Sequence, residues 1–91
     1  MDNNIEKIIV EKKGKNYFLA LQHKYQAQKQ EALANLETYF NSVVAIGEHS
    51  DLLPEHDKWV DLLATASDKL ETLNKYFELA DSTNTIHRLN S

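Results

Sequence analysis

Seven apolar positions recur at alternating steps of four and three residues in the second half of this chain. That spacing places all seven on one face of a single helix. The stripe predicts a long amphipathic helix over residues 54–80, whose apolar face has to be covered by another element. Its members are Trp59, Leu63, Ala66, Leu70, Leu73, Phe77 and Ala80.

A second long helix is predicted over residues 15–46. Steps of 3.6 residues from Phe18 land on apolar or aromatic residues at nearly every position, which is the pattern of a buried helical face. Gly47 suits the position after a helix end, and Pro54 suits the first turn of the next helix. A connector as short as 47–53 makes the two helices antiparallel neighbours. The stripe of this helix consists of Phe18, Leu21, Tyr25, Ala32, Leu36, Phe40 and Val43, with Lys29 as the exception.

The fold class that follows is all-α: an antiparallel helical hairpin in a single domain, residues 1–91. The chain has only two glycines and one proline, and so few turn formers argue against a β-sandwich or barrel. Residues 2–13 form an N-terminal segment in which the Ile8-Ile9-Val10 run suits a short strand as well as a helix; a short helix is the favoured expectation. Residues 81–91 are a polar C-terminal tail.

The apolar faces are wider than a two-helix seam needs. Leu62 and Tyr76 lie along one edge of the second stripe, and Val60 lies on the other. Faces of this width normally pack on more than one neighbour. We therefore expect a homo-oligomer, most simply a dimer that closes a four-helix bundle; the competing arrangement folds the N-terminal segment back as a third helix. The expected core and interface residues are Phe18, Leu21, Leu36, Phe40, Val43, Trp59, Leu62, Leu63, Leu70, Leu73, Tyr76 and Phe77.

Catalytic chemistry finds little support in the sequence. There is no cysteine, no glycine-rich phosphate loop and no serine in a nucleophile-elbow context, so we expect no enzyme and no cofactor. Glu48, His49 and His56 are the candidate metal ligands, because imidazole and carboxylate groups suit zinc. The spacing of these residues fits capping and solvation of a turn better than it fits a metal site.

Polar residues interrupt the apolar stripe in the middle of the first helix. In an oligomer, this stretch could contact an anionic, nucleotide-type ligand; otherwise it is an exposed helix surface. The basic stretch from Lys7 to Lys29 also contains aromatic residues, as single-stranded nucleic-acid sites do, but the net charge of −4 argues against nucleic acid. The candidate ligand contacts are Lys15, Tyr17, His23, Lys24 and Tyr25.

Residues 39–49, Tyr-Phe-Asn-Ser-Val-Val-Ala-Ile-Gly-Glu-His, and residues 68–73, Asp-Lys-Leu-Glu-Thr-Leu, resemble small uncharacterised proteins of tailed bacteriophages, chiefly large myoviruses and cyanophages. The similarity covers residues 30–77. It implies a phage origin and brings no activity or catalytic residues with it. Binding of a host factor, interference with host defence and a minor role in the virion are the contexts it implies.

The functional expectation is a non-catalytic interaction protein that binds a host or phage protein through an acidic face of the second helix or through the connector. The alternatives are an oligomeric protein that binds or sequesters a small anionic ligand and a minor structural protein of the virion. No apolar run approaches the 18 residues that a membrane span requires, so we expect no membrane partner and a location in the cytoplasm, the host's if the gene is a phage's.

Overall fold

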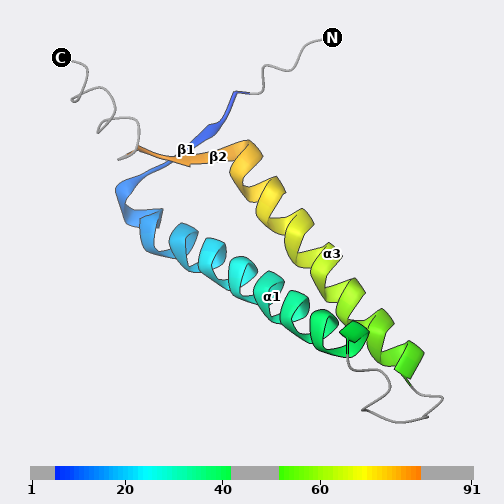
Figure 1. The fold of residues 1–91 in the computed structure, drawn as a ribbon. Coiled ribbons are helices and arrows are strands. Elements are labelled where there is room, and N and C mark those ends of the chain that lie inside the picture. Colours follow the sequence, from blue (N-terminus) through cyan, green and yellow to red (C-terminus); the bar gives the residue numbers. More distant parts are fainter. Residues whose placement is uncertain (1–5, 42–51, 81–91) are drawn as a thin grey trace, which may run out of the picture.

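A computed structural model describes residues 6–41 and 52–80 of the 91-residue chain. Two long helices make up most of this part, and a short strand lies at each end of it (Figure 1). In chain order the elements are the strand β1 (Ile8–Val10), a 3-10 turn (Lys12–Gly14), the helix α1 (Lys15–Asn41), the helix α3 (Leu52–Tyr76) and the strand β2 (Phe77–Leu79).

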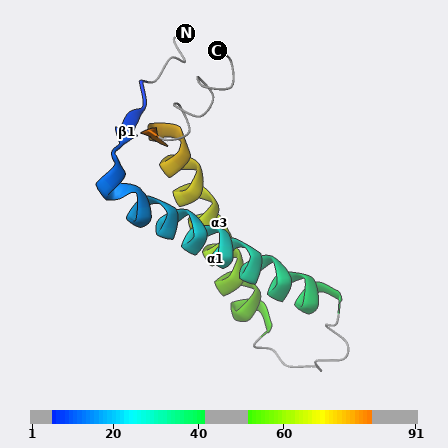
Figure 2. The same cartoon turned by 90° about the vertical axis from the view of Figure 1, so that its left-hand side faces the viewer.

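The helices α1 and α3 form an antiparallel hairpin, which confirms the fold class expected from the sequence. They lie close together at the end where the connector joins them, here called the connector end, and diverge toward the opposite, open end (Figure 1). The quarter-turn view shows that the two helices cross (Figure 2). The expected start of α1 at residue 15 is confirmed, and residues 42–46 of the expected helix lie outside the described residues.

The open end carries a parallel pair of strands, which corrects two expectations. The N-terminal segment contains a strand instead of the favoured short helix, and α3 ends at Tyr76 instead of residue 80. Ile8 pairs with Phe77, Ile9 with Glu78 and Val10 with Leu79. The physical reason is that β-branched residues favour extended backbone, and a ladder between the two segments satisfies backbone groups that a helix would otherwise pair internally.

The buried core is small and extends from the middle of the hairpin to the first turn of α1. Ala32 and Ala66 have no exposed surface, and Phe18 and Leu36 are also buried. Three of the residues expected in the core or at an interface are exposed in the single chain: Leu21, Phe40 and Tyr76. Val43 lies outside the described residues, and the other expected core residues of α3 are half-buried, as is Phe77 of β2.

Two helices that cross at an angle pack over a limited length, which limits how much of each stripe the partner helix can cover. Phe40 keeps most of its surface exposed although its ring lies 5.0 Å from that of His56 on α3. Alanine at the most buried positions allows the two backbones to approach closely. Neither of the two described helices is long and apolar enough to cross a membrane.

Candidate functional site

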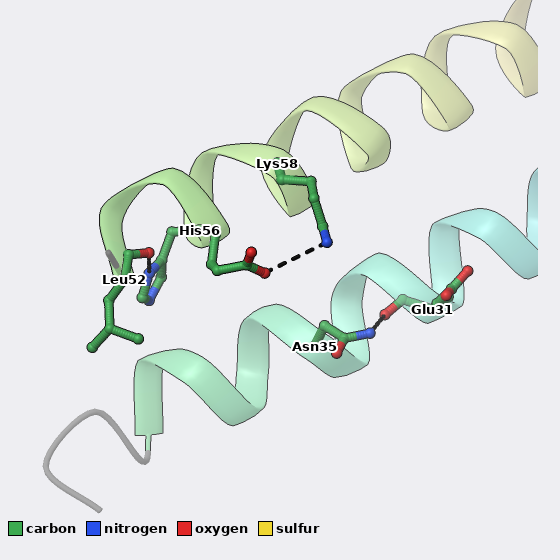
Figure 3. Close-up of polar contacts among 6 residues, drawn as sticks. Glu31, Asn35, Leu52, His56 and Lys58 are labelled. Carbon is green, nitrogen blue, oxygen red and sulfur yellow. Dashed lines mark hydrogen bonds and ion pairs between the residues drawn. The ribbon is translucent and has the colours of Figure 1, made fainter. Parts of the chain in front are cut away.

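His56 lies against α1 near the connector end of the hairpin. Its Nδ1 atom is 2.7 Å from the carbonyl oxygen of Leu52, one helical turn earlier (Figure 3). Because a carbonyl only accepts hydrogen bonds, the proton of this bond is on Nδ1. The imidazole ring lies 5.3 Å from the ring of Tyr39 and 5.0 Å from that of Phe40, measured between centroids. His56 therefore contacts residues of both helices.

An apolar surface surrounds His56 on one side of the hairpin. Leu53 precedes His56 by three residues and Val60 follows it by four, which places both beside it on α3. From α1, Phe40 contacts the imidazole ring, and Leu33 lies two turns before Phe40 on the same helix face. We call the set Leu33, Phe40, Leu53 and Val60 the hairpin-face patch.

All four side chains of the hairpin-face patch are exposed to solvent. Phe40 is 63% exposed and Leu53 is 77% exposed, and Leu33 and Val60 also retain more than a third of their surface. Single exposed apolar residues are normal, but neighbouring ones that form a patch with a polar rim mark sites of interaction.

The rim of the patch includes acidic residues on both helices. Glu37 follows Leu33 by four residues and precedes Phe40 by three, so it borders both. Asp57 likewise follows Leu53 by four residues and precedes Val60 by three. Both carboxylate side chains belong to exposed residues.

The nearest lysine of α3 does not neutralise this rim. The Nζ atom of Lys58 is 3.5 Å from a carboxylate oxygen of Glu55 (Figure 3). The same amine lies 4.9 Å from the centroid of the Trp59 ring. Lys58 is two residues before Val60 and therefore points away from the side of the helix that carries Val60.

The five residues expected to contact a small anionic ligand are not brought together. His23, Lys24 and Tyr25 are consecutive on α1, so their side chains point about 100° apart. Tyr17 is 81% exposed. Lys15 stands at the first turn of α1.

Of these five, Tyr25 has a defined setting between the helices. The amine of Lys69 lies 5.6 Å from the centre of its ring, a cation–π contact. Tyr25, Lys69 and Leu73 line a hollow of about 350 Å³, together with Asp68, Thr72 and Phe77.

A second hollow, of about 460 Å³, lies at the open end of the hairpin. Its wall includes Lys7 and Glu78 from the strand segments and the amides of Gln22 and Asn74. The Gln22 amide nitrogen donates a hydrogen bond of 2.8 Å to the Asn74 side-chain oxygen. Helical periodicity does not predict this hollow, because the hollow depends on the pairing of β1 with β2.

The candidate metal ligands are not assembled within the described residues. Glu48 and His49 lie outside them, and the Nδ1 atom of His56 is occupied by the Leu52 carbonyl. Over residues 6–41 and 52–80, no three or more histidine or acidic side chains form a cluster that could hold a metal ion.

Comparison with protein-family models, with curated proteins and with solved structures finds no match to this chain.

Proposed function

We propose that this chain is a non-catalytic interaction protein whose hairpin-face patch binds another protein. The observation that carries the proposal is the exposure of Leu33, Phe40, Leu53 and Val60 around the ring cluster of His56. Water-exposed apolar surface of this kind gains free energy when a partner covers it.

The chemistry of the patch favours a particular partner. Two crossing helices present a shallow apolar strip, which suits an amphipathic helix laid against it. Glu37 and Asp57 on the rim favour lysine or arginine beside the apolar residues of that helix, because opposite charges across an interface steer association and fix orientation. The proposed partner is thus a protein with an amphipathic, basic-edged helix.

The alternatives have less support. A small anionic ligand would need cationic and aromatic groups that converge, and the five residues expected to supply them are dispersed around α1. A phage origin, a host protein as the partner and a cytoplasmic location remain proposals that rest on the resemblance and on composition.

Affinity capture from the cells that express the gene tests the proposal. The bait is the full-length tagged chain, compared with the variant Val60→Asp, which adds a charge to the patch at a position exposed enough to accept it. We expect the recovery of at least one protein to fall by about tenfold or more, since burying an unpaired carboxylate at an interface costs well over 1 kcal/mol.

Tyr17→Asp is the matched control, because it makes the same kind of change at an exposed residue of α1 outside the patch. Circular dichroism checks that both variants keep their helices. Proteins recovered equally with the wild type, Val60→Asp and Tyr17→Asp, and none that depends on the patch, would overturn the proposal.

A further inference from the structure

The strand β1 has one edge that no other described strand covers. Within residues 6–41 and 52–80 the sheet consists of β1 and β2, so β2 takes one edge of β1 and no described strand takes the other. Ile8 is 59% exposed and Ile9 is 42% exposed. Parallel strands are normally covered, and a two-stranded sheet is marginal in water. The open edge of β1 is therefore a template for a further strand.

When two copies of the segment around β1 are placed antiparallel, their charged residues are complementary. Residues 6–12 read Glu-Lys-Ile-Ile-Val-Glu-Lys. In an antiparallel pair of two copies centred on Ile9, Ile9 faces Ile9 and Ile8 faces Val10. Lys7 of each copy then faces Glu11 of the other, so the two charged residues that flank the strand each lie opposite the other charge.

Backbone conformation supports the inner charge pair. Glu11 has φ −71° and ψ 169°, which is extended, so the strand geometry continues one residue beyond Val10. Lys7 and Glu11 are both exposed. Side chains directly opposite each other on antiparallel strands have Cβ atoms about 5 Å apart, close enough for an ion pair.

Neighbouring registers lose this complementarity. A slip of one residue in one direction places Glu6 opposite Glu11, and a slip of two in that direction places Lys7 opposite Ile9. Slips in the other direction move Lys7 past Glu11 toward Lys12 and Lys13, which belong to the 3-10 turn and are not extended. Like charges directly opposite each other are destabilising, so the charge pattern selects the register centred on Ile9.

We propose that β1 pairs with β1 of a second copy in this register, across a two-fold axis at Ile9. The result is a homodimer with one four-stranded sheet in the order β2, β1, β1, β2. The same patch on both copies forms the contact, as two-fold symmetry requires. This interface does not depend on the proposed function, because β1 and the hairpin-face patch lie at opposite ends of the hairpin (Figure 1).

Charge exchange on the purified full-length protein tests the register. Sedimentation equilibrium from micromolar to near-millimolar concentration should show a dimer for the wild type. Lys7→Glu places two carboxylates opposite each other twice in the dimer, and we expect the dissociation constant to rise by about tenfold or more. Glu11→Lys places two lysine amines opposite each other at both inner positions, and it should raise the dissociation constant in the same way. The double variant K7E/E11K restores both pairs and should restore the dimer.

Mixing the two single variants gives a sharper result. In a pair made of one K7E chain and one E11K chain, both inner positions bring together opposite charges. Equal amounts of the two should therefore form a heterodimer under conditions where each alone is monomeric. A helix-mediated dimer would not show this reciprocal behaviour.

A single cysteine tests the position of the axis. The chain has no cysteine, so Ile9→Cys introduces the only thiol, and opposite residues on antiparallel strands have Cα separations that a disulfide accepts. Under mild oxidation Ile9→Cys should form a covalent dimer faster than Tyr17→Cys, although Tyr17 is the more exposed residue.

Three outcomes would overturn the proposal: a wild type that stays monomeric at every concentration, a dimer that Lys7→Glu leaves unchanged, or Ile9→Cys that crosslinks no faster than Tyr17→Cys. A dimer lost with Val60→Asp and unaffected by Lys7→Glu would place self-association on the helices. Loss of partner capture in the earlier experiment has no bearing on these results.

Discussion

Gly14 joins the 3-10 turn to α1 and does not depend on the conformational freedom of glycine. A Cβ atom at this position would meet Cγ1 of Val10 at 3.4 Å, an ordinary contact, and the backbone is not left-handed. The Gly14 N–H donates to the Glu11 carbonyl at 2.9 Å, a bond that alanine retains. We expect Gly14→Ala to raise the free energy of unfolding by about 0.5 kcal/mol, because it restricts the unfolded chain. Urea unfolding followed by circular dichroism measures this, and a decrease would show that Val10 cannot accommodate the methyl group.

Trp59 has a buried indole nitrogen that finds no hydrogen-bond acceptor within the described residues. A buried donor without a partner costs about 1–3 kcal/mol. Phenylalanine removes that donor and keeps most of the ring, so Trp59→Phe should leave the free energy of unfolding within about 1 kcal/mol of wild type. Trp59→Ala should lose about 3 kcal/mol. Equal losses for both variants in urea unfolding would mean that the indole nitrogen is satisfied in solution.

The elements α1 and α3 meet at small residues, and this contact is where the fold is least tolerant of added volume. Ala66 has no exposed surface, whereas Ala64 on the same helix is exposed. Ala66→Leu should lower the free energy of unfolding by about 2 kcal/mol through overpacking. Ala64→Leu is the matched control and should change it by less than about 0.5 kcal/mol. Equal effects of the two substitutions on the urea midpoint would place the helix crossing elsewhere.

The β1–β2 ladder should open far more readily than the helices. Its strands are three residues long and β1 has an uncovered edge, and short two-stranded sheets are marginal in water. In the monomeric Lys7→Glu variant, we expect amides of residues 77–79 to exchange at least about tenfold faster than amides near Ala32 or Ala66. Hydrogen exchange read by mass spectrometry compares these peptides. Equal protection would mean that the ladder and the helices open as one unit.

Element type was predictable from the sequence where periodicity extends over several turns. The stripes that include Phe18 and Trp59 gave both helices, their antiparallel arrangement and the start of α1. The strands were not predictable in the same way, because a run of three apolar residues fits a helix or a strand equally well and its partner lies far along the chain. Phe77 continues the helical stripe and is nevertheless in a strand, since tertiary pairing overrides a local pattern.

The candidate site was predictable only in part. Val60, Leu33 and the acidic side of the second helix are visible in the sequence as apolar and charged positions outside the main stripes. The crossing of the helices decides which side chains meet, such as Phe40 and His56, and a crossing angle is not encoded in the period of one helix. Ala32 and Ala66 are the most buried of the described residues; both lie on the predicted stripes, although neither is among the expected core and interface residues.

The two ends of the hairpin differ in chemistry. The connector end presents apolar side chains with an acidic rim, and the open end presents a strand edge with alternating charges. An interface built on exposed ion pairs is screened by salt, whereas apolar burial is not. The two ends should therefore respond differently to ionic strength: added salt should weaken strand pairing, whereas at the patch it should weaken only the contribution of the acidic rim and leave the apolar contribution intact.

Dimer formation through β1 should be visible in the thermal stability of the whole chain. If folding and association are linked, the midpoint of thermal unfolding rises with protein concentration, by about 3 °C for each tenfold increase in a dimer of this size. We expect this dependence for the wild type and for K7E/E11K, and none for Lys7→Glu. Differential scanning calorimetry at several concentrations measures it. Val60→Asp is the control and should behave as the wild type does. A concentration dependence that Val60→Asp removes and Lys7→Glu retains would assign association to the hairpin-face patch.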